Sequence, residues 1–220
     1  MSYYRRFRII IGTPIFRIYL RWAYGRCLDD LKRLNFTPNF KKQNFTALLC
    51  GVGNESTADA LIRFVLERNP KAKIYIIDLG KDQVVAVKTL IKNKYPNLPV
   101  YVKQMDALNL SAWIPKNTVD WIETDWLFAF FSQKSLYSLL KVWHQLLSNI
   151  GIVTTRCGVD RNWFDRLVTK LIIWIGKIWL GVKLYPHSKA NLDRLIAKSG
   201  FRFVSRRMVL PTAFRYSLTK

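Results

Sequence analysis

The chain has 220 residues, of which 50% are hydrophobic and 23% are charged, and it carries a formal net charge of +22. This length fits one α/β domain with modest additions, and the hydrophobic fraction excludes an intrinsically disordered chain. Three cysteines without CxxC spacing and only two histidines, His144 and His187, exclude a metal-ligand set assembled from close neighbours.

The pattern of apolar residues and cysteines indicates a cytoplasmic protein. An odd number of cysteines without a signal peptide favours reduced thiols. The apolar run near the N-terminus is broken by Pro14 and Arg17, and residues 171–184 are interrupted by Lys177 and Lys183. Both stretches are too short to span a bilayer. We therefore expect a cytoplasmic location, with peripheral membrane attachment as the open alternative.

The positive charge is concentrated in the two flanks of the chain. Residues 1–46 hold 10 basic and 2 acidic residues, residues 47–156 hold 13 and 9, and residues 157–220 hold 13 and 3. Flanks of this kind are expected to face a polyanion, an anionic membrane or an acidic substrate. A general effect of charge on solubility is the simpler alternative.

Residues 1–44 predict a basic, aromatic and helical N-terminal extension. A helix fits between Pro14 and Leu34, with Ile15, Tyr19 and Trp22 on one face.

From residue 45 onward, short apolar runs alternate with helical patterns. The predicted strands cover 47–50, 73–78, 100–104, 119–123 and 152–155, and the predicted helices cover 54–68, 82–94 and 135–148, with a turn at 149–151 before the fifth strand. A last helix over 188–199 precedes two strands, 201–209 and 214–218, which are close enough to form an antiparallel hairpin. The pattern predicts an α/β fold: a doubly wound, mainly parallel, seven-stranded sheet with helices on both faces.

A helical cap is expected as an insertion at about residues 160–186. Its apolar residues recur at helical spacing, and the opposite positions carry Arg166, Lys170 and Lys177. The apolar residues are Trp163, Phe164, Leu167, Leu171, Trp174, Ile175, Ile178 and Trp179. Three interpretations remain open: a mobile lid over an acceptor site, an additional core helix, or a segment that contacts an anionic membrane.

Four groups of residues follow the predicted strands and suggest a nucleotide-like ligand. Gly51 and Gly53 form a turn that lets backbone approach a ligand, ahead of a helix N-terminus at Glu55. Asp78 ends the second strand, where a carboxylate can hold a ribose diol. Asp106-Ala107 follows the third strand, where a carboxylate can accept an adenine amino group. Each has an ordinary alternative as a packing turn, a solvated strand end or a loop residue.

The fourth group ends the strand at 119–123. Asp125 follows the acidic Glu123, and either Trp126 or Phe128 could place an aromatic face against a cationic ligand. The alternative is that these aromatic residues belong to the core.

Taken together, the four groups resemble the class I S-adenosylmethionine (SAM)-dependent methyltransferases over residues 47–156, with 188–218 matching the last helix and terminal hairpin of that family. The resemblance implies a Rossmann-like fold and SAM as cofactor. It implies that the glycine loop holds the methionine moiety, that Asp78 binds ribose and that Asp106 and Ala107 lie at the adenine. No metal is implied.

Two positions depart from the family pattern. Leu49 stands where many members have an acidic residue, and Glu55 stands where many have a third glycine. We expect Glu55 either to hold the methionine ammonium group or only to cap the helix.

The sequence therefore predicts a SAM-dependent methyltransferase that acts on a small or lipid-like acceptor, with an anionic membrane surface as a further partner. Asp125, as an acceptor-side and cofactor-binding residue, and His187 are the catalytic candidates, whereas His144 and Cys157 are expected to be structural. The alternative is an RNA or DNA methyltransferase, or a nucleic-acid-binding protein on the same fold, with Arg5, Arg6, Arg8, Arg206 and Arg207 contacting phosphates.

Overall fold

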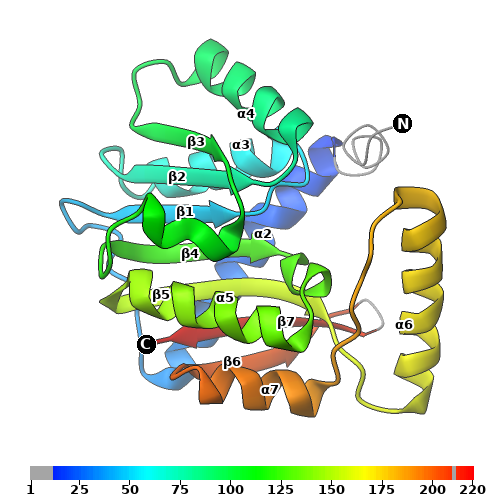
Figure 1. Ribbon diagram of the computed structural model, residues 1–220. Coiled ribbons are helices and arrows are strands. Elements are labelled where there is room, and N and C mark those ends of the chain that lie inside the picture. The colour runs from blue at the N-terminus through cyan, green and yellow to red at the C-terminus, as the bar shows by residue number, and fades with distance from the viewer. Residues whose placement is uncertain (1–11, 210–211) are drawn as a thin grey trace.

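The computed structural model describes residues 12–209 and 212–220, which build a seven-stranded sheet with helices on both faces (Figure 1). The strand order is β3-β2-β1-β4-β5-β7-β6, and only β7 runs antiparallel to its neighbours β5 and β6. The strands are β1 Thr46–Cys50, β2 Lys73–Asp78, β3 Val100–Gln104, β4 Val119–Asp125, β5 Leu147–Gly158, β6 Arg202–Arg207 and β7 Ala213–Thr219. The predicted fold, a mainly parallel sheet with an antiparallel terminal hairpin, is confirmed.

The helices lie close to the predicted ranges. They are α2 Pro14–Leu31, α3 Glu55–Leu66, α4 Lys81–Lys94, α5 Gln133–Leu146, α6 Trp163–Ile175 and α7 Lys189–Lys198. Short 3₁₀ turns cover Lys32–Leu34 (η1), Ala107–Ala112 (η2) and Leu127–Phe130 (η3), and a π turn covers Gly176–Leu180 (η4).

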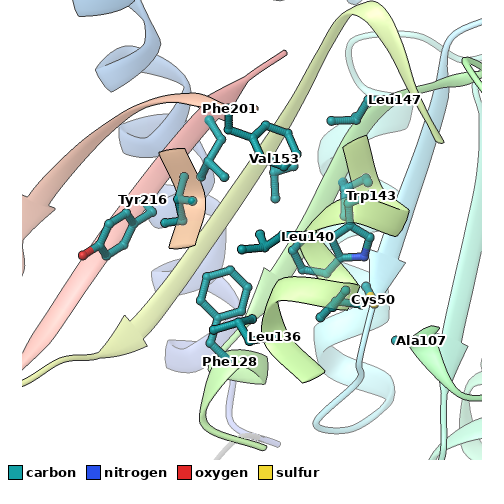
Figure 2. Packing of buried hydrophobic residues seen from close by; sticks show 14 of the residues in the cluster. Cys50, Ala107, Phe128, Leu136, Leu140, Trp143, Leu147, Val153, Phe201 and Tyr216 are labelled. Carbon is teal, nitrogen blue, oxygen red and sulfur yellow. The ribbon is translucent and has the colours of Figure 1, made fainter. Parts of the chain in front are cut away.

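Two hydrophobic clusters, one on each face of the sheet, form the core. Successive residues of β1 alternate between them: Leu48 and Cys50 join the cluster under α5 and α7, and Ala47 and Leu49 join the cluster under α2 and α3. Figure 2 shows the first cluster, in which residues of α5 pack on the sheet. Because β1 is buried on both faces, its residues from Ala47 to Cys50 are all apolar, as expected for a central parallel strand.

The face of α2 that packs on the sheet is not the one that carries Ile15 and Trp22. Ile15 and Trp22 are 78% and 52% exposed, whereas Leu20 and Tyr24 are fully buried. The reason is an aromatic contact: the Tyr24 ring stands edge-on to Trp121 of β4, with the ring centroids 5.8 Å apart. Helix α2 therefore shares the core with the central strands.

The turn predicted at residues 149–151 is wrong, because these residues lie inside β5. The pairing of β4 with β5 shifts register between Val119 and Trp121. A Cβ atom at Gly151 would lie 2.9 Å from the Val119 carbonyl oxygen. The glycine thus permits a close approach of two strands.

The insertion after β5 folds as α6 and η4 beside the carboxyl ends of the strands (Figure 1). Trp163 and Trp174 of α6 are 72% and 60% exposed, so the interpretation of this segment as a core helix is wrong. Within residues 12–209 and 212–220, no helix has the length and apolar character that a bilayer crossing requires.

Candidate functional site

The order of the strands in the sheet changes direction between β1 and β4, although the two strands are parallel. The predicted site residues lie near this point. From β1 the sheet continues through β2 and β3 on one side and through β4 and β5 on the other. In open α/β sheets, ligands bind outside the carboxyl ends of the strands where the order reverses.

Gly51 ends β1 in a backbone conformation that favours glycine, with φ at +84°. Its amide donates to the Ile77 carbonyl at 3.0 Å. A Cβ atom at this position would lie 3.0 Å from Leu127 Cδ1. Glycine is therefore required at position 51, both for its backbone conformation and because η3 approaches closely. Gly53 lies in the same turn.

The turn leads into α3, whose first residue is Glu55. Asn54 caps this helix, because its Oδ1 accepts from the amides of Ser56 and Thr57 at 3.0 and 3.2 Å. Asn54 is 0% exposed, and its Nδ2 has no hydrogen-bond partner among the described residues. A buried donor without a partner is costly in a folded protein, and a ligand acceptor would satisfy it.

Asp78 joins the loops that follow β1 and β2. Its Oδ2 accepts from the Val52 amide and its Oδ1 from the Gly80 amide, both at 2.6 Å. Burial raises the pKa of the Asp78 carboxyl, and the two backbone donors oppose that shift. Each carboxylate oxygen can accept a second hydrogen bond, so the pair of oxygens fits a diol.

Asp106 and Ala107 follow the end of β3, whose last residue, Gln104, pairs with Asp78 of β2. Asp106 Oδ1 accepts from the Leu108 amide at 2.9 Å and caps η2, and the Met105 amide donates to the Asp78 carbonyl at 3.0 Å. Burial raises the pKa of the Cys50 thiol, and the charges of Asp78 and Asp106 raise it further. The fold therefore brings the glycine turn, Asp78 and Asp106 together around the end of β1.

Asp125 ends β4 and forms an ion pair that the sequence analysis missed. Arg156 of β5 is 0% exposed, and its Nε lies 2.8 Å from Asp125 Oδ1 while its Nη2 lies 2.7 Å from Glu123 Oε1. Thr154 also donates to Glu123, and Trp121 donates to Thr154 at 2.7 Å. Burial raises the pKa of Glu123 to about 7, against the opposing attraction of Arg156.

A signal for this ion pair was present in the sequence. Glu123 and Asp125 are two positions apart, so they share one face of the predicted fourth strand. Carboxylates in a buried strand need a cation, and Arg156 is the basic residue that directly follows the predicted fifth strand.

His187 lies where the insertion returns to the sheet. It is 2% exposed, and its Nε2 lies 3.0 Å from the Phe128 carbonyl oxygen of η3. Because a carbonyl only accepts, Nε2 is the donor in this contact. Burial lowers the pKa of His187, which favours the neutral form of the ring. The neighbouring Tyr185 amide donates to the Ala129 carbonyl at 2.7 Å, so the segment is fastened to η3.

The two aromatic residues after β4 have different surroundings. Phe128 is 0% exposed and packs against Trp143, with the ring centroids 5.8 Å apart, so for this residue the core alternative holds (Figure 2). Trp126 is half-buried, and its ring covers Gly158, where a Cβ atom would lie 3.1 Å from Cζ3.

The other candidates also have defined places. Cys157 is buried and burial raises its pKa, while His144 packs edge-on to Phe201, with the ring centroids 5.2 Å apart. Arg206 and Arg207 lie at the end of β6, whereas Arg5, Arg6 and Arg8 lie outside the described residues.

A hollow of about 450 Å³ lies elsewhere, at the outer edge of β3. Residues of α4 and β3 line it, among them Lys88, Lys92 and Tyr101. It adjoins neither the glycine turn nor Asp78. Among the described residues, no group of three or more side chains is placed to hold a metal ion.

Comparisons with known proteins rest on the fold, because no protein-family model and no curated protein sequence matches the chain. PKMT2 from Rickettsia typhi, in complex with AdoHcy, has 15% identity and a TM-score of 0.66; the match covers 90% of this chain and 53% of that protein. Magnesium protoporphyrin IX methyltransferase from Synechocystis PCC 6803, with bound SAH, has 12% identity and a TM-score of 0.63, with 98% and 94% covered.

A third similar structure is mitomycin 7-O-methyltransferase MmcR, with 13% identity and a TM-score of 0.58; the match covers 100% of this chain and 61% of that protein. The chain thus spans less than two thirds of the length of two of these three proteins. At these identities the likeness concerns the fold, and it agrees with the strand order and the antiparallel β7. The chain has the Rossmann-like fold of the class I SAM-dependent methyltransferases.

Proposed function

We propose that this chain binds SAM and transfers its methyl group to a small or lipid-like acceptor. The observation that carries the proposal is the cluster at the end of β1, where the Gly51 turn, Asp78 and the unpartnered Nδ2 of Asn54 lie together. SAM supplies an activated methyl group on a sulfonium, and transfer can proceed by alignment alone.

The residues present fit the parts of such a cofactor. Gly51 and Gly53 would let backbone approach the methionine moiety, and Asn54 Nδ2 would donate to its carboxylate at the N-terminus of α3. Glu55, in the first turn of α3, is proposed to face the ammonium group. Asp78 would accept from the ribose hydroxyls, and Asp106 with Ala107 would border the adenine.

Asp125 and His187 are proposed to act on the acceptor side. Asp125 is held by Arg156 through one oxygen and keeps its other oxygen as an acceptor. His187 is held neutral by burial, which is the state that a proton-accepting imidazole requires. Both residues lie at the carboxyl ends of the strands, where the insertion begins and returns.

Calorimetry with SAM and S-adenosylhomocysteine tests the cofactor proposal. The Asp78→Ala variant removes a charged acceptor, so we expect its affinity for both ligands to fall by about tenfold to a hundredfold. Asp82→Ala is the matched control, because Asp82 is an exposed carboxylate four residues later in the first turn of α4. Absence of binding by the wild-type chain at millimolar ligand would refute the proposal.

The acceptor class is tested with SAM that carries a labelled methyl group. Label recovered in the organic extract or in small polar compounds would support the proposed acceptor. Label recovered in RNA or DNA would instead support the alternative that the net charge of +22 allows.

A further inference from the structure

The polar side of α6 contacts the chain segments that precede and follow the helix. Thr169 donates to the Asp160 carboxylate, and Asp165 accepts from Arg161 Nε at 2.6 Å. Gly176, which follows the helix, is buried against Leu184, and a Cβ atom there would lie 2.8 Å from Leu184 Cδ1. At 100° per residue, Asp165, Thr169 and Gly176 share one side of the helix.

The opposite side of α6 is apolar and faces away from the protein. We call it the apolar arc, and its members are between 41% and 72% exposed: Trp163, Phe164, Leu167, Leu171, Ile172, Trp174, Ile175 and Ile178. A core helix would show the reverse arrangement, with its apolar side against the sheet. An exposed apolar surface of this kind indicates a binding partner.

Cations border the apolar arc. Arg166, Lys170 and Lys177 are exposed and share a strip of the helix next to Trp163 and Trp174. This combination of an apolar arc, amphipathic indole rings and a basic strip suits a helix that lies in the plane of a membrane interface.

The carboxyl ends of β2 and β6 and the first turn of α2 lie at the same edge of the sheet as α6 (Figure 1). Leu79 follows β2 and is 71% exposed, and Val209 follows β6 and is 97% exposed. Ile15, in the first turn of α2, is 78% exposed, and the ion pair between Arg17 and Asp59 at 3.6 Å holds this turn beside the start of α3. Several separate elements therefore expose apolar side chains at the carboxyl ends of the strands.

We propose that the apolar arc of α6 docks this protein onto the surface of an anionic lipid bilayer. Charge complementarity favours this partner, because the chain carries +22 and the basic strip borders the arc. A second copy of the chain would bring two such charges together. Docking through α6 would turn the carboxyl ends of the strands toward the lipid. The proposal concerns the partner of α6 and holds whether or not the chain transfers methyl groups.

Vesicle sedimentation with the full chain, without cofactor, tests the proposal. We expect binding to an equal mixture of phosphatidylglycerol and phosphatidylcholine, and at least about tenfold weaker binding to phosphatidylcholine alone. Raising the salt from about 0.1 M to about 1 M shortens the Debye length from about 10 Å to about 3 Å. Binding to the anionic vesicles should then also weaken by at least about tenfold. Tryptophan emission should shift to shorter wavelength when the anionic vesicles bind.

The variants separate α6 from the rest of the surface. Leu167→Ser/Leu171→Ser should weaken binding by at least about tenfold, since two leucines leave the lipid. Ile150→Ser is the control. Ile150 is exposed to the same degree as Leu167, 51% against 53%, but it lies near the amino end of β5, away from α6. Lys170→Gln/Lys177→Gln should weaken binding to anionic vesicles more than the control Lys71→Gln/Lys116→Gln does. The control changes the net charge equally, but its lysines precede β2 and β4, at the amino ends of the strands.

Several outcomes would overturn the proposal. They are absence of binding to anionic vesicles, unchanged binding by the leucine variant, and an equal loss in the Ile150→Ser control. Self-association that is lost in the leucine variant would assign the arc to a second copy. Binding of single-stranded RNA that is lost in the leucine variant, without vesicle binding, would assign it to nucleic acid. None of these outcomes bears on whether the chain binds SAM, which calorimetry tests separately.

Discussion

Replacement of Arg156 by methionine should destabilise the protein in a way that depends on pH. The guanidinium is 0% exposed and lies 2.7 Å from Glu123 and 2.8 Å from Asp125. Removing one partner of a buried ion pair costs about 3–5 kcal/mol, because the remaining charge stays buried. This is a large part of the roughly 5–15 kcal/mol by which a domain is stable.

The pH dependence follows from Glu123. Burial raises its pKa to about 7, and loss of Arg156 would raise that pKa further. The folded state then binds a proton that the unfolded chain, with a glutamate pKa near 4.3, has released. The free energy of unfolding of Arg156→Met should therefore fall as the pH rises from 5 to 8, by at most about 1.4 kcal/mol per pH unit. Its difference from the wild-type chain should grow above about pH 7, where the wild-type Glu123 becomes ionised.

Urea unfolding at several pH values measures both effects. In the double variant Glu123→Gln/Arg156→Met the pH dependence should largely disappear and part of the stability should return, since one buried charge is gone. Arg161→Met is the comparison for a more exposed pair, and it should cost much less stability than Arg156→Met. A cost below about 1 kcal/mol for Arg156→Met, or a cost that is equal at every pH, would refute the reasoning.

Two further predictions concern single residues. Gly51→Ala should lower the free energy of unfolding by about 1–2 kcal/mol, because φ is +84° and the new Cβ atom meets Leu127. Gly25→Ala in α2 should instead stabilise the protein by about 0.5–1 kcal/mol, because the new Cβ atom meets nothing within 4 Å. Thermal melts of both variants measure this contrast. For His187, burial lowers the pKa in the folded state, so the unfolded chain binds more protons and stability should fall as the pH drops below about 6.5. Urea unfolding at pH 5 to 8 should show that the free energy of unfolding falls less toward low pH in His187→Gln than in the wild-type chain. An equal fall in both proteins would contradict the lowered pKa of His187.

Much of the fold could be predicted from local patterns. Apolar runs that end at Gly51, Asp78 and Gln104 became β1, β2 and β3, because each run is short and is followed by a helical pattern. The grouping of Gly51, Asp78 and Asp106 followed from topology, since parallel strands end at one edge of a sheet. Their predicted roles toward a cofactor remain predictions.

Local patterns indicate that Glu123 and Asp125 need a cation, but they do not show which contacts form between distant residues. The charges of Glu123 and Arg156 are 33 positions apart, and only the pairing of β4 with β5 joins them. In α2, apolar residues occur on more than one side, so periodicity alone did not select Tyr24 over Trp22 as the buried residue. In α6, the spacing predicted an apolar stripe, but only the contacts of Asp165 and Thr169 show that this stripe faces outward.

The position of β7 has a consequence for how the chain is synthesised. Strand β7 lies between β5 and β6, and it also contacts α2: Ser217 donates to the Cys27 carbonyl at 2.7 Å across 190 positions, and Arg215 pairs with Asp30 across 185. Contacts of such sequence separation form slowly, and their absence leaves apolar surface exposed. During translation, α2 can pack on α3 and β4 early, but the part of its surface that contacts β7 stays uncovered until β7 has been synthesised.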